Sequence, residues 1–167
     1  PGGSVLFFVG YLTPTGNTLS VTCGEPAMGR MSDTDLAFID HANVELRRYN
    51  FDGSDFSLVG TGLSLGSATG VAVAGLDGSM AAVVHAVNNT LIAYTHNGST
   101  WSQTGNAFDL NAVLGDITDP AITNLSATRV AVVDHLQDKA GIFDFDGSDW
   151  SLIGNLLALT GNSNPDI

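Results

Sequence analysis

Positively charged residues are scarce in this chain of 167 residues. It holds five lysines and arginines against seventeen aspartates and glutamates, which leaves a formal net charge of −12. A field of this sign repels the phosphate backbones of nucleic acids. We therefore expect no nucleic acid partner.

Cysteine and long apolar runs are scarce as well. The lone Cys23 cannot form an internal disulfide, so we expect a small buried side chain there and no disulfide framework. The first 24 residues carry no charge, but polar and turn residues interrupt them at 13–18, so they predict neither a membrane helix nor a signal peptide. The chain opens on Pro1, which favours a processed product or part of a longer protein.

Helical periodicity and helix-capping patterns are also missing. Hydrophobic residues make up 44% of the chain and glycines number 20, a composition that suits many short strands joined by tight turns. Asp134-His135 is only half of a catalytic triad, with no nucleophile placed for it. The sequence therefore predicts an all-β protein that is not an enzyme.

An internal repeat is present instead. Segments 37–53, 82–98 and 131–147 align without a gap, and the glycines that end them are spaced by 45 and 49 residues. Each segment is followed at one fixed offset by an aromatic residue, a serine and a glycine: Phe56, Ser57 and Gly60; Trp101, Ser102 and Gly105; Trp150, Ser151 and Gly154. A repeat of this length predicts a solenoid, propeller or array.

Each unit holds four short apolar runs, and Asp-Gly or Asn-Gly turns separate some of them at hairpin spacing. In the third unit we expect strands near 121–125, 129–134, 140–145 and 150–159. Four strands per unit predict a β-propeller with four-stranded blades.

The unit boundaries predict one domain of about three and a half blades. Residues 1–24 are either the outer half of a blade or a connection to a preceding segment; 25–70, 71–118 and 119–164 are full blades, and 165–167 begin another. Propellers close with about four to eight blades, so this arc would leave open sheet edges. We therefore expect more chain, a homo-oligomer or a place in a larger assembly.

Polar residues recur at the end of the second strand of each unit, and they are Asp40, His41, His85, Asp134 and His135. Equivalent positions of a propeller share one face, so these residues could form a binding surface for a glycan or a partner, or hold a metal. Alternatively, they satisfy backbone groups of the turn that follows.

Two further groups of residues have alternative interpretations. Asp144, Asp146 and Asp149 are spaced as in calcium sites, but the turn persists at 96–100 without carboxylates, which favours a plain hairpin; no other cofactor is expected. Phe56, Trp101 and Trp150 could stack on sugar rings or anchor the core between neighbouring blades.

The repeats from Glu25 to Ile167 resemble a family of propeller-like proteins from marine bacteria and their phages, whose repeats carry Asp-Gly-Ser-x-Trp and Trp-Ser/Thr-Gln-Leu-Gly elements. Phe56 and Thr61 depart from that pattern in the first unit. Residues 1–24 are also similar to the opening of phage tail-collar domains.

The propeller resemblance implies adhesion, with no catalytic residues. We therefore expect a phage tail, fibre or capsid-surface protein, located on the virion or outside the cell, that binds other virion or surface proteins or a host glycan. A secreted bacterial adhesin and a propeller glycoside hydrolase or lyase are the alternatives.

Overall fold

The structure is a computed structural model that describes residues 27–67 and 69–159, in which all regular secondary structure is β. The first sheet contains β1 (Ala27–Arg30), β2 (Asp35–Asp40), β3 (Glu45–Phe51), β4 (Phe56–Leu58) and β5 (Leu63–Ser64). The second contains β6 (Val71–Gly75), β7 (Met80–His85), β8 (Thr90–His96) and β9 (Trp101–Asp109). The third contains β10 (Pro120–Asn124), β11 (Arg129–Asp134), β12 (Lys139–Phe145) and β13 (Trp150–Ala158).

In each sheet the first four strands form an antiparallel meander in chain order. The strands of the third sheet begin and end within one residue of the expected ranges. In the first sheet the outer strand is split into β4 and β5, which both pair with β3, whereas β9 and β13 are continuous. Each sheet lies within one of the predicted units, and we call them the first, second and third blade.

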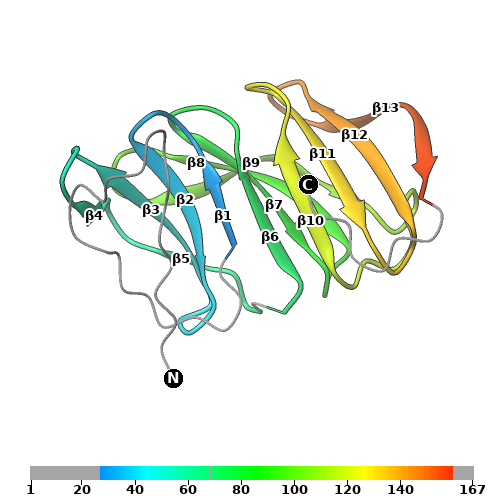
Figure 1. Cartoon of the computed structure of the whole chain (residues 1–167), viewed down its shortest axis with the longest axis horizontal. Coiled ribbons are helices and arrows are strands. Elements are labelled where there is room, and N and C mark those ends of the chain that lie inside the picture. Colours follow the sequence, from blue (N-terminus) through cyan, green and yellow to red (C-terminus); the bar gives the residue numbers. More distant parts are fainter. Residues whose placement is uncertain (1–26, 68, 160–167) are drawn as a thin grey trace.

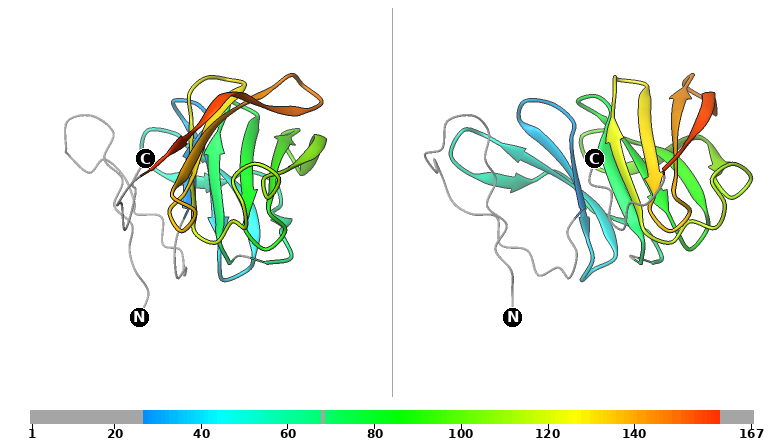
Figure 2. Two further views of the ribbon diagram at one scale, coloured as in Figure 1. Left: turned by 90° about the vertical axis from the view of Figure 1, so that its right-hand side faces the viewer. Right: turned by 45° about the vertical axis from the view of Figure 1, so that its right-hand side comes forward.

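The three blades stand side by side in chain order, and their first strands β1, β6 and β10 are neighbours (Figure 1). Two further views show the same order of the blades (Figure 2). Backbones of β1 and β6 touch where both strands carry glycine, because a Cβ on Gly29 would lie 2.3 Å from the Gly75 nitrogen. The first strands of the blades therefore form one packed inner layer.

The hydrophobic core fills the two spaces between blades. One cluster joins the first and second blades and includes Ile39, Leu46, Val83 and Trp101. The other joins the second and third blades and includes Val84, Leu91, Val132, Phe143 and Trp150. Because side chains alternate along a strand, the second blade contributes Val83 to one cluster and Val84 to the other.

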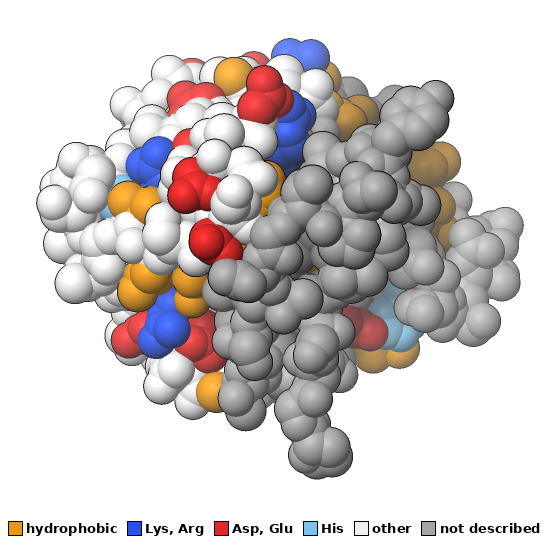
Figure 3. Space-filling view, turned by 60° about the vertical axis from the view of Figure 1, so that its left-hand side comes forward, with side chains coloured by type: hydrophobic (Ala, Val, Ile, Leu, Met, Phe, Trp, Pro, Cys, Tyr) orange, Lys and Arg blue, Asp and Glu red, His pale blue; other side chains and the backbone are white. Residues whose placement is uncertain are grey.

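All five basic side chains form an ion pair or a hydrogen bond with a neighbouring residue. Carboxylates pair with Arg30, Arg47, Arg48 and Arg129, while the Lys139 ammonium donates to the Leu114 carbonyl at 3.1 Å. On the face seen in Figure 3, blue basic groups accordingly lie among red acidic ones.

Several sequence predictions lie outside the described residues. These are the half blade at 1–24, the further blade start at 165–167, and the buried position expected for Cys23. Within 27–67 and 69–159 there is no helix long and apolar enough to cross a membrane.

Candidate functional site

Asp40, His85 and Asp134 occupy the same place in the three blades, at the ends of β2, β7 and β11. All three are buried, with exposed fractions of 5%, 4% and 0%. The backbone N–H groups of Ala42 and Asn43 donate to Oδ1 of Asp40 at 3.0 and 3.1 Å. Both aspartates are inside the fold, where they organise the turn that follows.

Asp134 uses its two oxygens in two directions. Oδ1 accepts the backbone N–H groups of Leu136 and Gln137, both at 3.0 Å. Oδ2 accepts the backbone N–H groups of Thr118 at 2.8 Å and Asp119 at 3.1 Å. The carboxylate therefore ties the entry to β10 against the turn after β11 and positions Asp119.

Asp40 differs in the partners of its second oxygen. Oδ2 accepts from Asn43 Nδ2 at 2.9 Å and lies 2.9 Å from Nη1 of Arg47. Burial would raise the pKa of Asp40, but the hydrogen bonds from Asn43 and the Arg47 guanidinium outweigh burial and hold its pKa below the ordinary value. Asp40 is therefore an ionised structural carboxylate at neutral pH.

His85 is buried in the same place without a comparable network. Its Nε2 has no hydrogen-bond partner in the described part of the chain, and burial lowers its pKa. A neutral imidazole at the second blade thus replaces the carboxylates of the first and third blades.

His41 and His135 lie one residue beyond Asp40 and Asp134 and reach the inner layer. His135 Nδ1 is 3.1 Å from Oδ2 of Asp119. His41 lines a pocket of about 370 Å³ against β1, β6 and β10. Of the five residues predicted to share a binding surface, only His41 lines this pocket.

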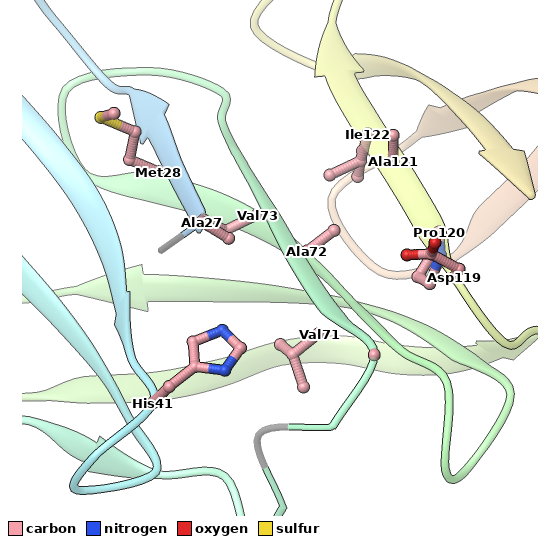
Figure 4. Close-up of a pocket in the computed structure, with 11 residues that line it drawn as sticks. Ala27, Met28, His41, Val71, Ala72, Val73, Asp119, Pro120, Ala121 and Ile122 are labelled. Carbon is pink, nitrogen blue, oxygen red and sulfur yellow. The ribbon is translucent and has the colours of Figure 1, made fainter. Parts of the chain in front are cut away.

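The pocket has a small apolar floor and two polar edges. The alanines Ala27, Ala72 and Ala121, one from each inner strand, line it. Figure 4 shows His41 on one side of β6 and the Asp119 carboxylate on the other. His41 Nε2 is itself buried and has no hydrogen-bond partner among the residues described, so His41 lines the pocket with its ring and not with this nitrogen.

Asp119 was not among the predicted site residues, although a signal for it exists. An acidic residue precedes proline at the start of two units, as Glu25-Pro26 and Asp119-Pro120. The pairs mark the boundaries of units, but they also place a carboxylate where an inner strand begins. The side chain of Asp119 is 66% exposed, which leaves it open to a ligand.

The predicted calcium residues are dispersed among separate partners. Asp146 Oδ1 accepts the backbone N–H groups of Ser148 and Asp149 at 2.8 Å, which forms the hairpin turn and lowers the pKa of Asp146. Asp144 pairs with Arg129 at 3.2 Å, and Asp149 accepts from Asn106 Nδ2 at 2.8 Å. These hydrogen bonds are those of a plain hairpin turn. Within the described ranges, no group of three acidic, histidine or cysteine side chains is placed to hold a metal ion.

Two of the three predicted aromatic residues are in the core. Trp101 and Trp150 are 5% and 4% exposed, and each packs in a cluster between blades. Phe56 is half-buried, and its ring centroid lies 4.8 Å from that of Phe51. The two tryptophans therefore anchor neighbouring blades and are not accessible for stacking on a sugar.

The sequence also contains a Gly-x-Ser-x-Gly pattern at 62–66. A nucleophile elbow needs this serine on a turn between a strand and a helix. Ser64 instead belongs to the two-residue edge strand β5, where it pairs with Glu45. The pattern does not form an elbow here.

Comparison with known proteins shows the fold. No family model and no curated protein sequence matches the chain. The structure is similar to a mutant of the Aleuria aurantia lectin solved in complex with α-methyl-L-fucoside, with a TM-score of 0.56 and 14% sequence identity. The match covers 89% of this chain and 50% of the lectin chain, so this chain spans about half of that lectin. The prediction of a β-propeller with four-stranded blades is confirmed, and the described residues form three of them.

Proposed function

We propose that the chain is a non-enzymatic carbohydrate-binding module that acts in adhesion. The observation that carries the proposal is the pocket of about 370 Å³ on the inner layer, edged by His41 and Asp119. Its volume lies near the lower end of the range of small-molecule sites, about 300–1,000 Å³. The similarity to a propeller lectin supports a sugar as the ligand.

The residues of the pocket suit the two kinds of surface that a sugar presents. The alanine floor accepts the apolar face of a pyranose ring, because methyl side chains let a ring approach the strands closely. The Asp119 carboxylate accepts hydrogen bonds from hydroxyl groups, and the His41 ring forms the opposite wall of the pocket. His135 Nδ1 lies 3.1 Å from Oδ2 of Asp119 and holds this carboxylate in place.

Binding to a glycan array, followed by calorimetry with the best sugar, tests this site. Asp119→Asn removes the charge and should weaken binding by about tenfold to a hundredfold, since a hydrogen bond to a charged group contributes about 1.5–3 kcal/mol. His41→Ala should weaken it as well. Asp138→Asn is the matched control, because Asp138 is an exposed aspartate of the third blade outside the pocket. Unchanged affinity in Asp119→Asn would contradict the proposed site.

The proposed setting is a virion or an extracellular surface. The resemblance of the repeats to propeller-like proteins of marine bacteria and phages supports it, with a phage tail, fibre or capsid-surface protein as the first candidate and a bacterial adhesin as the second. Mass spectrometry of purified virions separates the two, since only a virion component should be found there in stoichiometric amounts.

A glycoside hydrolase would need two carboxyl groups that flank the scissile bond, about 5–9.5 Å apart. Among the described residues of the pocket, only Asp119 carries a carboxylate. Asp40, Asp134 and Asp146 are committed to backbone N–H groups in turns. The geometry therefore favours binding over hydrolysis, and cleavage of a bound oligosaccharide would contradict this part of the proposal.

A further inference from the structure

The first blade packs against the turn between β8 and β9 of the second blade. A Cβ on Gly60 would lie 2.0 Å from the carbonyl oxygen of Ser99 in this turn. The Thr61 backbone N–H donates to the same oxygen at 2.8 Å. The contact between these two blades therefore depends on the position of the Ser99 carbonyl and on the groups that hold its turn.

His96 holds this turn with one ring nitrogen. The Gly98 backbone N–H donates to Nδ1 of His96 at 3.1 Å, and Nη1 of Arg48 on the first blade lies 3.4 Å from the same atom. A backbone amide and a guanidinium are donors only, so Nδ1 accepts from both and carries no proton. The hydrogen bonds therefore fix the neutral tautomer of His96 that has its proton on Nε2.

The surroundings of the ring also oppose a positive charge. His96 is 2% exposed, and its ring packs edge-on against Trp101 with centroids 4.9 Å apart. Burial and the Arg48 guanidinium lower the pKa of His96, and they outweigh the Val59 carbonyl and the Asp35 carboxylate, which raise it. Arg48 of β3 lies 2.9 Å from Asp35 of β2, and this ion pair holds the guanidinium beside the ring.

The second and third blades meet in the same way but without these two side chains. A Cβ on Gly105 would lie 2.0 Å from the Ser148 carbonyl oxygen, and the Asn106 backbone N–H donates to that oxygen at 2.7 Å. Phe145 and Ala93, both buried, stand in the places of the histidine and the arginine. The fold therefore does not need a histidine at this place, and the histidine gives the first contact a property that the second lacks.

We propose that His96 makes the contact between the first and second blades sensitive to pH. Protonation places a hydrogen on Nδ1, which removes the acceptor of the Gly98 N–H and of Arg48. It also places a second positive charge beside the guanidinium. The turn then no longer holds the Ser99 carbonyl in position, so the first blade loosens in mild acid while the contact between the second and third blades persists.

The direction of the effect follows from proton binding. In the open form His96 is exposed and has its ordinary pKa of 6.5, whereas in the closed form its pKa is lower. Opening therefore takes up a proton between these two pKa values. The closed form has its full stability above pH 6.5 and loses stability as the pH falls below it. In that range the opening constant should rise by at most about tenfold for each pH unit.

Hydrogen exchange of two backbone amides tests the proposal. The protection factor of the Thr61 amide should fall by roughly threefold to tenfold when the pH is lowered by about one unit from neutral-histidine conditions. The Asn106 amide is the internal control, and its protection factor should stay constant, because destabilisation of the whole chain would lower both. His96→Phe installs the residue of the third blade and should make the Thr61 protection factor independent of pH. Equal falls at Thr61 and Asn106, or an unchanged fall in His96→Phe, would overturn the proposal.

The ring itself provides a second measurement. The nitrogen chemical shifts of His96 in NMR spectra should show a proton on Nε2 at neutral pH. Arg48→Gln keeps a hydrogen-bond donor but removes the positive charge, so the ring should titrate at higher pH in this variant. A proton on Nδ1 at neutral pH, or an unchanged titration in Arg48→Gln, would also overturn the proposal.

Ligand binding gives a further readout, which rests on the proposed function. The pocket takes His41 from the first blade and Asp119 from the third, so a loosened first blade should weaken sugar binding in acid. His96→Phe should lose this additional weakening while His41 is still present. Absence of sugar binding at every pH would contradict the proposed function alone, because the exchange of the Thr61 and Asn106 amides is measured without a ligand.

Discussion

Gly60 and Gly105 each pack against the Gly-Ser turn of the following blade, and we call this contact a blade joint. Alanine substitution at two glycines separates the energy of a blade joint from the cost of the backbone conformation. Gly105 and Gly154 have φ values of +71° and +70°, so alanine is equally strained at both. That strain costs about 1–2 kcal/mol. Only Gly105 has a neighbour within 4 Å, the Ser148 turn, with its carbonyl oxygen 2.0 Å from the added Cβ.

The additional cost at Gly105 follows from the contacts that the methyl group would break. The Ser148 turn must move away, which loses the hydrogen bond from the Asn106 backbone, worth about 1 kcal/mol. It also loses the bond from the Asn106 amide to the Asp149 carboxylate, worth about 1.5–3 kcal/mol because one partner is charged. Gly105→Ala should therefore cost about 2–4 kcal/mol more than Gly154→Ala.

Urea unfolding followed by the fluorescence of the two buried tryptophans measures both free energies. Gly60→Ala should repeat the result of Gly105→Ala, since its Cβ would lie 2.0 Å from the Ser99 carbonyl oxygen. Equal costs for Gly105→Ala and Gly154→Ala would refute the assignment of the joint.

Three other predictions concern the core, pH and metal. Trp150→Ala should lower the free energy of unfolding in urea by about 3–5 kcal/mol, because Trp150 is 4% exposed between two blades; a cost below about 1 kcal/mol would contradict that placement. Burial holds the pKa of His85 below 6.5, so the unfolded chain takes up the proton first and the free energy of unfolding should decline as pH falls below 6.5. This decline should be smaller in His85→Gln. An identical pH profile in that variant would contradict the contribution of His85 to the decline. EDTA and added calcium should both leave the thermal unfolding midpoint unchanged, and stabilisation by calcium would restore the metal interpretation of Asp144, Asp146 and Asp149.

The blades were predictable because their signals are local. Hydrophobic alternation and the Asp-Gly turns predicted the strands of the third blade to within one residue. The fixed offset from the aromatic residue to the glycine also anticipated a repeated structural feature, which the structure shows to be the joint of Gly60 and Gly105 with the next blade.

The pocket was less predictable, because it depends on contacts between units. His41 was identified from its position after a strand, but nothing local distinguishes it from His135, which turns to Asp119 instead. The split of the first outer strand into β4 and β5 was not predicted either. Single-unit patterns do not show which neighbouring blade a side chain will face.

The two described joints differ where the repeat differs. At the first joint, Arg48 lies 2.9 Å from Asp35 and 3.4 Å from Nδ1 of His96. Burial and the Arg48 guanidinium both lower the pKa of His96, so the ring is neutral there. At the second joint the equivalents of Arg48 and His96 are Ala93 and Phe145, both buried. The shared glycines build each joint, and the variable side chains make each joint distinct.

A pocket can form within this repetitive structure because the units differ at a few positions. Residues common to all units, such as the turn glycines, are accounted for by the fold. The candidate ligand-binding groups occupy positions that differ: the second blade has Ala86 where the first has His41, and Gly70 where the third has Asp119. The central blade therefore supplies a hollow of small residues, and the outer blades supply its polar edges. A ligand that uses both edges spans three blades, so its affinity should depend on the integrity of both joints as well as on His41 and Asp119 themselves.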